Sequence, residues 1–291
     1  MSPTDRPTND YEVLDAGAGR RLERFGDRLV DRPHPAAILS PEAPELWRDA
    51  GLRFDRDTGW TGPQSEGGPW AIAVAGLTLE LRATESGGVG LFPEQLGNVP
   101  WVAAAIRERA RVAGSTSARA GSTPAVLNLF AHTGLLTLAA AAVGAAVTHV
   151  DASRTAVAWA RRNAELSGLA GAPVRWLVDD ALGFVRREAR RGRRYDGLLL
   201  DPPSYGHGGS RPWRLEADLP ELLEACADIS AGDAFVLLTA HTTGVDDDRL
   251  AGEIRHAFRE QGRLALESRP MELQARSGAR LALGTAIRLS A

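Results

Sequence analysis

The chain of 291 residues has a single cysteine, no lysine and no apolar run long enough to span a bilayer. One thiol, Cys226, excludes both an internal disulfide framework and a cysteine-based metal cluster, and we expect no metal site. Its surroundings, ELLEACADIS, have helical spacing and predict a buried structural thiol. All 34 basic residues are arginine, which a GC-rich genome favours, so we give the lack of lysine no functional weight.

The sequence also lacks a large basic excess. A net charge of −3 argues against a protein that coats nucleic acid by charge alone, although a local basic patch stays possible. The hydrophobic share of 44% and the charged share of 24% are typical of a soluble globular protein. Residues 1–10 have neither a basic start nor an apolar stretch, so we predict a short disordered tail, no membrane association and a cytoplasmic location.

Composition changes along the chain predict its organisation. Residues 11–91 are rich in Gly, Pro, Arg and Trp, with short alternating stretches such as WAIAVAG and LTLELRAT, and predict a β-rich N-terminal domain. Residues 92–124 contain one amphipathic helix and a linker, SARAGSTP. A third unit then covers residues 125–291.

This third unit alternates strands and helices. We predict strands at 125–130, 146–151, 173–179, 195–201 and 233–240, with helices at 133–145, 153–168, 181–191, 215–230 and 246–262. Apolar strands between helices of this length predict an α/β fold with a doubly wound parallel sheet. Two last strands, at 263–273 and 279–290, predict an antiparallel hairpin at the sheet edge.

Two segments resemble a glycine-rich nucleotide-binding turn. LDAGAG, residues 14–19, has more glycines and matches the motif more closely. However, it leads into the polar RRLERFGDRLV, and no apolar strand ending in an acid follows. We predict a hairpin turn there. VLNLFAHTG, residues 126–134, follows an apolar strand and precedes an alanine-rich helix, and the next strand ends in Asp151, placed to accept hydrogen bonds from ribose hydroxyls.

The loop at 126–134 has only one glycine at its end, Gly134, so it lacks a pyrophosphate cradle. Adenosine with a short amino-acid arm therefore suits it better than a dinucleotide. Asp179 and Asp180 end the third strand, and we favour Asp180 as acceptor for the adenine amine, the alternative being a helix N-cap. Asn128, Asp151 and Asp180 would all lie at the carboxyl edge of the sheet, where ligands of such folds bind.

The fourth strand leads into LLLDPPSYG, residues 198–206, a turn made rigid by two prolines. Methyl transfer from a sulfonium is an in-line displacement that benefits from positioning. In this interpretation Asp201 and the Pro202 carbonyl accept hydrogen bonds from an amine or a base edge, and Tyr205 offers a face for stacking. The alternative is an ordinary turn with a solvent-facing tyrosine.

These motifs, together with VTHVDASRTAVAWARRNAELSGL and GLFPEQ, resemble the bacterial class I S-adenosylmethionine-dependent methyltransferases related to 23S ribosomal RNA methyltransferases. The resemblance covers nearly the whole chain. It implies a Rossmann-like fold and S-adenosylmethionine as cofactor. It also implies that Asn128 to Gly134, Asp151, Asp180 and Asp201 contact the cofactor and that Phe92 to Gln95 lie near its methionine end. The predicted cofactor-binding residues are Asn128, Leu129, Phe130, Ala131, His132, Thr133, Gly134, Asp151, Ala152, Asp179, Asp180, Ala181, Phe92 and Gln95. The predicted catalytic residues are Asp201, Pro202, Pro203 and Tyr205.

One departure from the family concerns the acceptor atom. Relatives that methylate carbon 5 of cytosine use a cysteine after the fifth strand as a nucleophile, and this region reads LLTAHTTG here. Methylation at nitrogen or oxygen is therefore favoured. His241 assists proton removal or merely caps the strand, and we favour the cap; His132 is expected to pack rather than titrate.

Three functions remain open from the sequence. The first is a methyltransferase of RNA, with ribosomal RNA as partner, in which the basic run at 186–194 touches phosphates or is simply solvated. The second is a small-molecule methyltransferase. The third is a binding-only protein with a degenerate fold, against which the intact DPPSY counts. The sequence does not indicate an oligomeric state.

Overall fold

The computed structural model describes residues 9–115, 122–206, 212–241, 247–261 and 265–290. The chain forms two compact units: residues 1–96 with 272–283, and residues 97–271 with 284–291. The predicted tail at residues 1–8 and most of the predicted linker, 116–121, lie outside the described residues. The helix of the predicted connecting segment belongs to the second unit.

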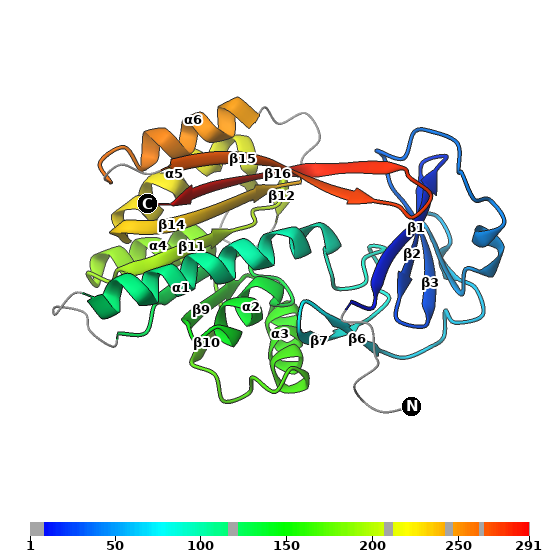
Figure 1. The fold of residues 1–291 in the computed structure, drawn as a ribbon, viewed down its shortest axis with the longest axis horizontal. Coiled ribbons are helices and arrows are strands. Elements are labelled where there is room, and N and C mark those ends of the chain that lie inside the picture. The colour runs from blue at the N-terminus through cyan, green and yellow to red at the C-terminus, as the bar shows by residue number, and fades with distance from the viewer. Residues whose placement is uncertain (1–8, 116–121, 207–211, 242–246, 262–264, 291) are drawn as a thin grey trace. The chain divides into compact units, whose positions relative to one another are not determined.

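The first unit is built from β-strands. Its five-stranded sheet has the order β1-β2-β3-β4-β5, and a separate hairpin pairs β6 with β7 (Figure 1). The strands are β1 (Tyr11–Gly17), β2 (Arg20–Phe25), β3 (Arg28–Pro33), β4 (Leu52–Asp55), β5 (Gly59–Thr61), β6 (Trp70–Val74) and β7 (Leu77–Leu81). Two 3₁₀ helices complete it, Leu46–Asp49 and Pro93–Asn98, the second running into the other unit.

The LDAGAG segment is a hairpin turn, as predicted. β1 and β2 pair antiparallel around Ala18 and Gly19, both in left-handed backbone conformations. Asp15 is buried and accepts hydrogen bonds from the backbone of Glu42 and Ala43 and from Nε1 of Trp47. Its carboxylate therefore holds a loop of the first unit in place. This structural role explains why an acid precedes the turn, and no bound nucleotide is needed to explain it.

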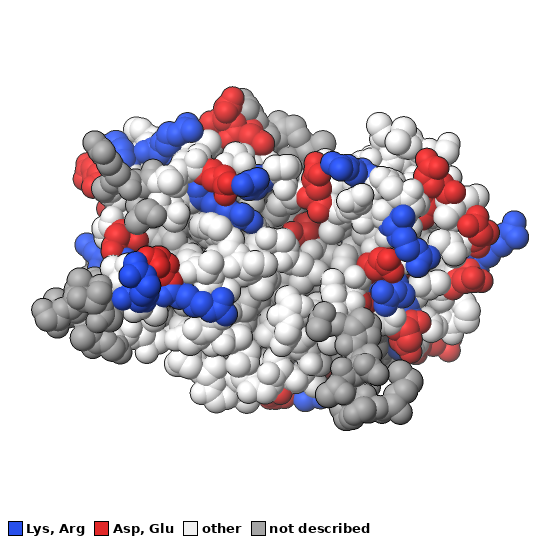
Figure 2. All heavy atoms as spheres, viewed as in Figure 1, with Lys and Arg blue, Asp and Glu red and all other residues white. Residues whose placement is uncertain are grey.

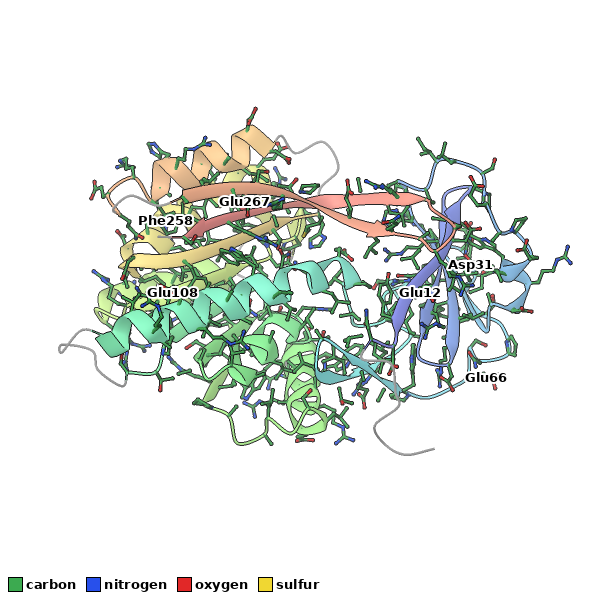
Figure 3. All side chains as sticks on the ribbon, in the orientation of Figure 1. Glu12, Asp31, Glu66, Glu108, Phe258 and Glu267 are labelled. Atoms are coloured by element: carbon green, nitrogen blue, oxygen red, sulfur yellow. The ribbon has the colours of Figure 1, made fainter. Side chains whose placement is uncertain are left out.

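Charged side chains stabilise the interior of this β-rich unit. Asp31 in β3, labelled in Figure 3, accepts from Arg20 at 2.5 Å and from Arg53 at 2.7 Å. Glu23 is fully buried, and its carboxylate is held by Arg32 at 2.6 Å. Because the paired arginines offset its desolvation, the pKa of Glu23 stays below its ordinary value.

The second unit contains a seven-stranded sheet in the order β10-β9-β8-β11-β14-β16-β15. Its strands are β8 (Ala125–Leu129), β9 (Ala146–Asp151), β10 (Val174–Val178), β11 (Tyr195–Leu200), β14 (Ser230–Ala240), β15 (Ala265–Gln274) and β16 (Arg280–Ser290). The first five run parallel, and β16 pairs antiparallel with β14. The predicted doubly wound fold and its antiparallel ending are confirmed.

Helices cover both faces of this sheet (Figure 1). They are α1 (Val99–Ser115), α2 (Leu135–Ala142), α3 (Arg154–Leu166), α4 (Ala181–Arg190), α5 (Leu215–Asp228) and α6 (Asp247–Ala257). Alternate residues of each strand point to opposite faces. Leu127, Leu198 and Val236 pack with α4, α5 and α6, whereas Val126, Leu199 and Phe235 pack with α1 and α2. Phe258, just after α6, is buried in the first of these cores (Figure 3).

The end of the chain differs from its predicted place in one respect. The tip of the β15–β16 hairpin, residues 272–283, belongs to the first unit rather than to the second. There Ala275 bridges to Val13, and the Arg276 N–H donates to the Val13 carbonyl at 2.8 Å. Alternating sequence predicts a strand but does not show which sheet each half of the strand joins. Within the described ranges, no helix has the length and apolarity needed to cross a membrane.

Candidate functional site

The site begins where the strand order of the second unit reverses. β8 lies between β9 and β11, so the loops after β8 and β11 leave neighbouring strands at the same edge of the sheet. The Asp201 N–H lies 3.4 Å from the carbonyl of Leu129, the last residue of β8. Open α/β sheets bind their ligands at such a switch point, outside the carboxyl ends of the strands. The geometry thus brings the predicted cofactor loop and the predicted catalytic turn together.

The loop after β8 has an unusual backbone. Phe130, His132 and Gly134 all have positive φ angles, of 54°, 46° and 90°. Left-handed conformations cost free energy in residues other than glycine, so the surrounding contacts must hold them. The Ala131 N–H donates to the Val150 carbonyl at 3.1 Å, and the Thr133 carbonyl accepts from Nδ2 of Asn163 in α3 at 2.9 Å. The loop is therefore fixed by β9 and α3.

Gly134 closes the loop against α3. A Cβ added there would lie 2.9 Å from the Cβ of Ala160, closer than real Cβ contacts allow. Its φ of 90° also disfavours any L side chain. A single glycine is thus needed for close packing of strand, loop and helix rather than as part of a phosphate cradle.

Asp151 ends β9 directly beside this loop. Its Oδ2 accepts from the His132 N–H, and its Oδ1 accepts from the Ser153 N–H, both at 2.8 Å. Each carboxylate oxygen has a second lone pair that can accept from a ribose hydroxyl. The carboxylate therefore holds the loop backbone and can also accept hydrogen bonds from the two ribose hydroxyls. Burial lowers the pKa of His132 below its ordinary value, so this imidazole is neutral.

Asn128 lies beneath the loop rather than at its surface. It is buried, and its Nδ2 donates to Oγ1 of Thr137 in α2 at 2.9 Å. Oγ1 of Thr137 in turn lies 2.9 Å from Nδ1 of His149. Since strand residues alternate between faces, Asn128 points to the face covered by α1 and α2. Sequence reasoning missed Thr137 and His149, whose only signal is a polar residue inside an apolar segment.

The acids after β10 have separate partners. Asp180 is the N-cap of α4, with Oδ1 accepting from the Gly183 N–H at 2.8 Å. Asp179 forms an ion pair with Arg187, and its other oxygen accepts from the Asp180 N–H. The N-cap alternative is thus observed for Asp180. Its Oδ2 has no partner among the described residues and can accept from an adenine amine.

Asp201 is held by the neighbouring strand. Oγ1 of Thr239, in β14, lies 2.5 Å from Oδ1 of Asp201, and Nε2 of His241 lies 2.9 Å from the same oxygen. The carboxylate is 18% exposed, so it is screened from bulk solvent yet reachable. Thr239 and His241 are polar residues at the carboxyl end of an apolar strand. The sequence LLTAH therefore contains the signal by which both could be predicted.

The DPPSY turn is braced by a tryptophan. Tyr205–Gly206 (β12) pairs antiparallel with Trp213–Arg214 (β13). Nε1 of Trp213 donates to the Pro203 carbonyl at 2.7 Å, and its ring lies 5.1 Å from that of Phe130. Pro202 is buried, Pro203 is exposed, and Tyr205 is 52% exposed as a residue. Trp213 thus links the predicted cofactor loop to the predicted catalytic turn, and no sequence spacing reveals that link.

Other predicted residues have simpler surroundings. Ala181 is buried as the first residue of α4, and Ala152 is exposed after β9. Phe92 and Gln95 belong to the first unit, where Phe92 is exposed and Gln95 is buried; their contact with a cofactor stays a prediction. Over the described ranges, no three His, Cys, Asp or Glu residues form a group that could hold a metal.

Comparison with known proteins places these features in a family. The model of the family described as "Conserved hypothetical protein 95" matches residues 110–212. Ribosomal RNA large subunit methyltransferase K of Neisseria meningitidis is 30% identical over 145 residues, 48% of this chain. The match spans 41% of that relative's length, so the two proteins are alike over less than half of either.

A solved structure matches the chain over almost its whole length. The S-adenosylmethionine-dependent methyltransferase from Agrobacterium tumefaciens is 33% identical, with a TM-score of 0.87 over 97% of this chain and 90% of that one. The chain belongs to the class I S-adenosylmethionine-dependent methyltransferases. The structure of SMU.776, a protein complexed with S-adenosylhomocysteine, shares the fold at a TM-score of 0.77 and 15% identity over 98% of this chain and 76% of that one.

The site of this methyltransferase fits its cofactor. Ribose hydroxyls and an adenine amine are donors. Asp151 ends β9 and Asp180 follows the neighbouring β10, and both have accepting oxygens. The loop between β8 and α2 has a single glycine, Gly134, that packs against Ala160 of α3. It therefore has no glycine-rich phosphate cradle, which suits a ligand that has no phosphate. S-adenosylmethionine is the methyl donor, whereas the particular contacts of each residue stay predictions.

Proposed function

We propose that this methyltransferase acts on a nitrogen atom of an RNA base, with ribosomal RNA as the substrate class. The observation that carries the proposal is the open oxygen of Asp201. Oδ1 is occupied by Thr239 and His241, while no described residue donates to Oδ2. An ionised carboxylate only accepts hydrogen bonds, so Oδ2 suits an acceptor that carries an N–H group.

The cysteine argues against carbon 5 of a pyrimidine as the methylated atom. Cys226 lies in α5, fully buried, and burial raises the pKa of its thiol above the ordinary value. A buried neutral thiol in a helix cannot add to a pyrimidine ring as the carbon-5 mechanism requires. β14 instead ends at Ala240, and His241 follows it.

Two observations favour RNA. The relative from Neisseria is named for methylation of the large ribosomal subunit RNA, and it is 30% identical to this chain over 145 residues. Tyr205, four residues after Asp201, has an exposed ring that can stack on a base. Asp201 and Tyr205 would then contact the edge and the face of the same base.

A small-molecule acceptor is the second candidate, and the charge distribution favours it. In the view of Figure 2, arginine and acidic side chains lie beside each other rather than in a continuous positive field. The arginines of α4 and the turn after it are largely engaged within the second unit. These pairs are Arg186 with Glu221, Arg187 with Asp179, Arg191 with Glu188, and Arg194 with the Asp228 carbonyl.

Methyl transfer to separated fractions tests the proposal. Purified enzyme and radiolabelled S-adenosylmethionine are incubated with RNA from cells lacking the gene and, in parallel, with their small-metabolite extract. We expect label in large-subunit ribosomal RNA, and nuclease digestion should give a nucleoside methylated on nitrogen. Label confined to the metabolite fraction would overturn the RNA proposal in favour of the second candidate.

The role of Asp201 has its own test. Asp201→Ala should abolish transfer and spare most of the affinity for S-adenosylmethionine, because the lost oxygen faces the acceptor. Calorimetric titration of the cofactor checks the second half of this expectation. A collapse of cofactor affinity would instead assign Asp201 to the cofactor.

A further inference from the structure

The pair formed by Asp201 and His241 has a definite geometry. Nε2 of His241 lies 2.9 Å from Oδ1 of Asp201, and Oγ1 of Thr239 lies 2.5 Å from the same oxygen. Thr239 is fully buried, while the side chains of His241 and Asp201 are 25% and 18% exposed. One carboxylate oxygen therefore faces the protein, and no described residue donates to the other.

Elementary hydrogen-bond chemistry gives the direction of these bonds. An ionised carboxylate has no hydrogen to donate, so Nε2 of His241 carries the hydrogen of the pair. Two donors on one oxygen stop rotation of the carboxylate about its Cβ–Cγ bond. We propose that His241 is a positioning residue that, with Thr239, fixes Asp201 so that Oδ2 is presented to the N–H group of the acceptor. This inference rests on the proposed role of Asp201 in the transfer.

The backbone supports a built position for His241 rather than a chance contact. Gly284 in β16 has a φ of 133°, and a Cβ added there would lie 2.0 Å from the Ala240 carbonyl oxygen and 3.0 Å from Cα of His241. Thr285 pairs with Ala240 across the two strands. Only glycine permits this approach, so β16 holds the backbone of His241 against the end of β14.

The charge of His241 matters because it faces the carboxylate. A neutral imidazole donates an ordinary hydrogen bond to Asp201, whereas an imidazolium neutralises the carboxylate and weakens Oδ2 as an acceptor.

Two substitutions separate the hydrogen bond from the charge. His241→Phe keeps a ring without a donor, and His241→Gln places an amide donor, which does not titrate, near the position of Nε2. The matched control is His256, an exposed histidine of α6, replaced by the same two residues. For each variant the enzyme is assayed with the fraction that accepts methyl groups, for kcat, for KM, for the pH profile and for the Kd of S-adenosylmethionine.

We expect His241→Phe to lower kcat about 10- to 100-fold, since a hydrogen bond to a charged group is lost, with the cofactor Kd changed by less than about threefold. His241→Gln should restore kcat to within about threefold, because its amide supplies the lost donor. The His256 variants should match the wild type. Wild-type kcat in His241→Phe, or a rise in cofactor Kd as large as the fall in kcat, would overturn the inference.

A spectroscopic measurement decides the same point without turnover. In ¹⁵N-labelled enzyme, the imidazole nitrogen shifts of His241 should report hydrogen on Nε2 at neutral pH, and Asp201→Asn should change that signal while His256 stays the same. Hydrogen on Nδ1 would overturn the inference even if the enzyme methylates RNA. If the acceptor is a small molecule, the RNA proposal fails. The His241 variants are then assayed with that small molecule, and the inference about His241 stands or fails on those rates.

Discussion

Nδ2 of Asn128 donates to Oγ1 of Thr137 at 2.9 Å, and the same hydroxyl lies 2.9 Å from Nδ1 of His149. This buried chain joins β8, α2 and β9 next to the predicted cofactor loop. His149 is fully buried, its Nε2 has no hydrogen-bond partner in the described structure, and burial lowers its pKa to about 3. The loop thus rests on a polar network that is neutral at physiological pH.

Protonation of His149 should make stability depend on pH. The unfolded chain binds this proton near pH 6.5, its ordinary pKa, and the folded chain does so only near pH 3. The contribution is therefore complete above pH 6.5 and is lost as pH falls towards 3, by up to about 1.4 kcal/mol per pH unit. His34, whose pKa burial lowers to about 4, acts with the same sign in the first unit.

His149→Asn keeps a polar group near Thr137 and removes the titration. We expect the variant to lose about 1 kcal/mol less stability than the wild type between about pH 7.5 and about pH 5.5. Urea unfolding at both pH values measures the difference, and the unchanged His34 cancels in the comparison. An equal pH dependence in variant and wild type would show that His149 is not the group responsible.

The predictions from the sequence agree with the structure for features that are set by residues close together in the chain. Gly134, the strand ends at Asp151 and Asp201, and the hairpin at Ala18 and Gly19 all follow from neighbouring residues, because turns and strand ends are local features. Asn128 shows the limit of such predictions. The sequence does not reveal whether an amide side chain near the end of a strand points to the ligand or into the core. Trp213 and the tip of the β15–β16 hairpin depend on pairings between distant segments, for which a single sequence carries no signal.

Gly134→Ala should cost more than a left-handed conformation alone. Gly144 provides the control, because its φ of 91° matches the 90° of Gly134, and nothing lies within 4 Å of its added Cβ. Both variants pay the conformational penalty, and only Gly134→Ala meets Ala160. We expect it to lose about 1 to 3 kcal/mol beyond the loss of Gly144→Ala, together with weaker cofactor binding. Denaturant unfolding and calorimetric titration measure both, and equal losses would contradict the close packing.

Cys226→Ala should leave methyl transfer intact. The thiol is fully buried, and its raised pKa keeps it protonated, so turnover should stay within about twofold of the wild type. A thiol reagent should fail to label the native enzyme and should label it after unfolding in urea. Loss of transfer in a folded Cys226→Ala protein would instead revive a covalent route to a pyrimidine carbon.

Trp213 should control the catalytic turn through two separable contacts. Trp213→Phe keeps a ring beside Phe130 and loses the donor to the Pro203 carbonyl, whereas Trp213→Ala loses both. Because small misplacements of a positioned acceptor cost catalysis, we expect Trp213→Ala to lower kcat/KM by about 100-fold and Trp213→Phe by about 10-fold. Only the alanine variant should also weaken cofactor binding, since Phe130 belongs to the cofactor loop. Steady-state kinetics with a cofactor titration separate these effects, and wild-type kinetics in both variants would mean that the turn holds its shape without Trp213.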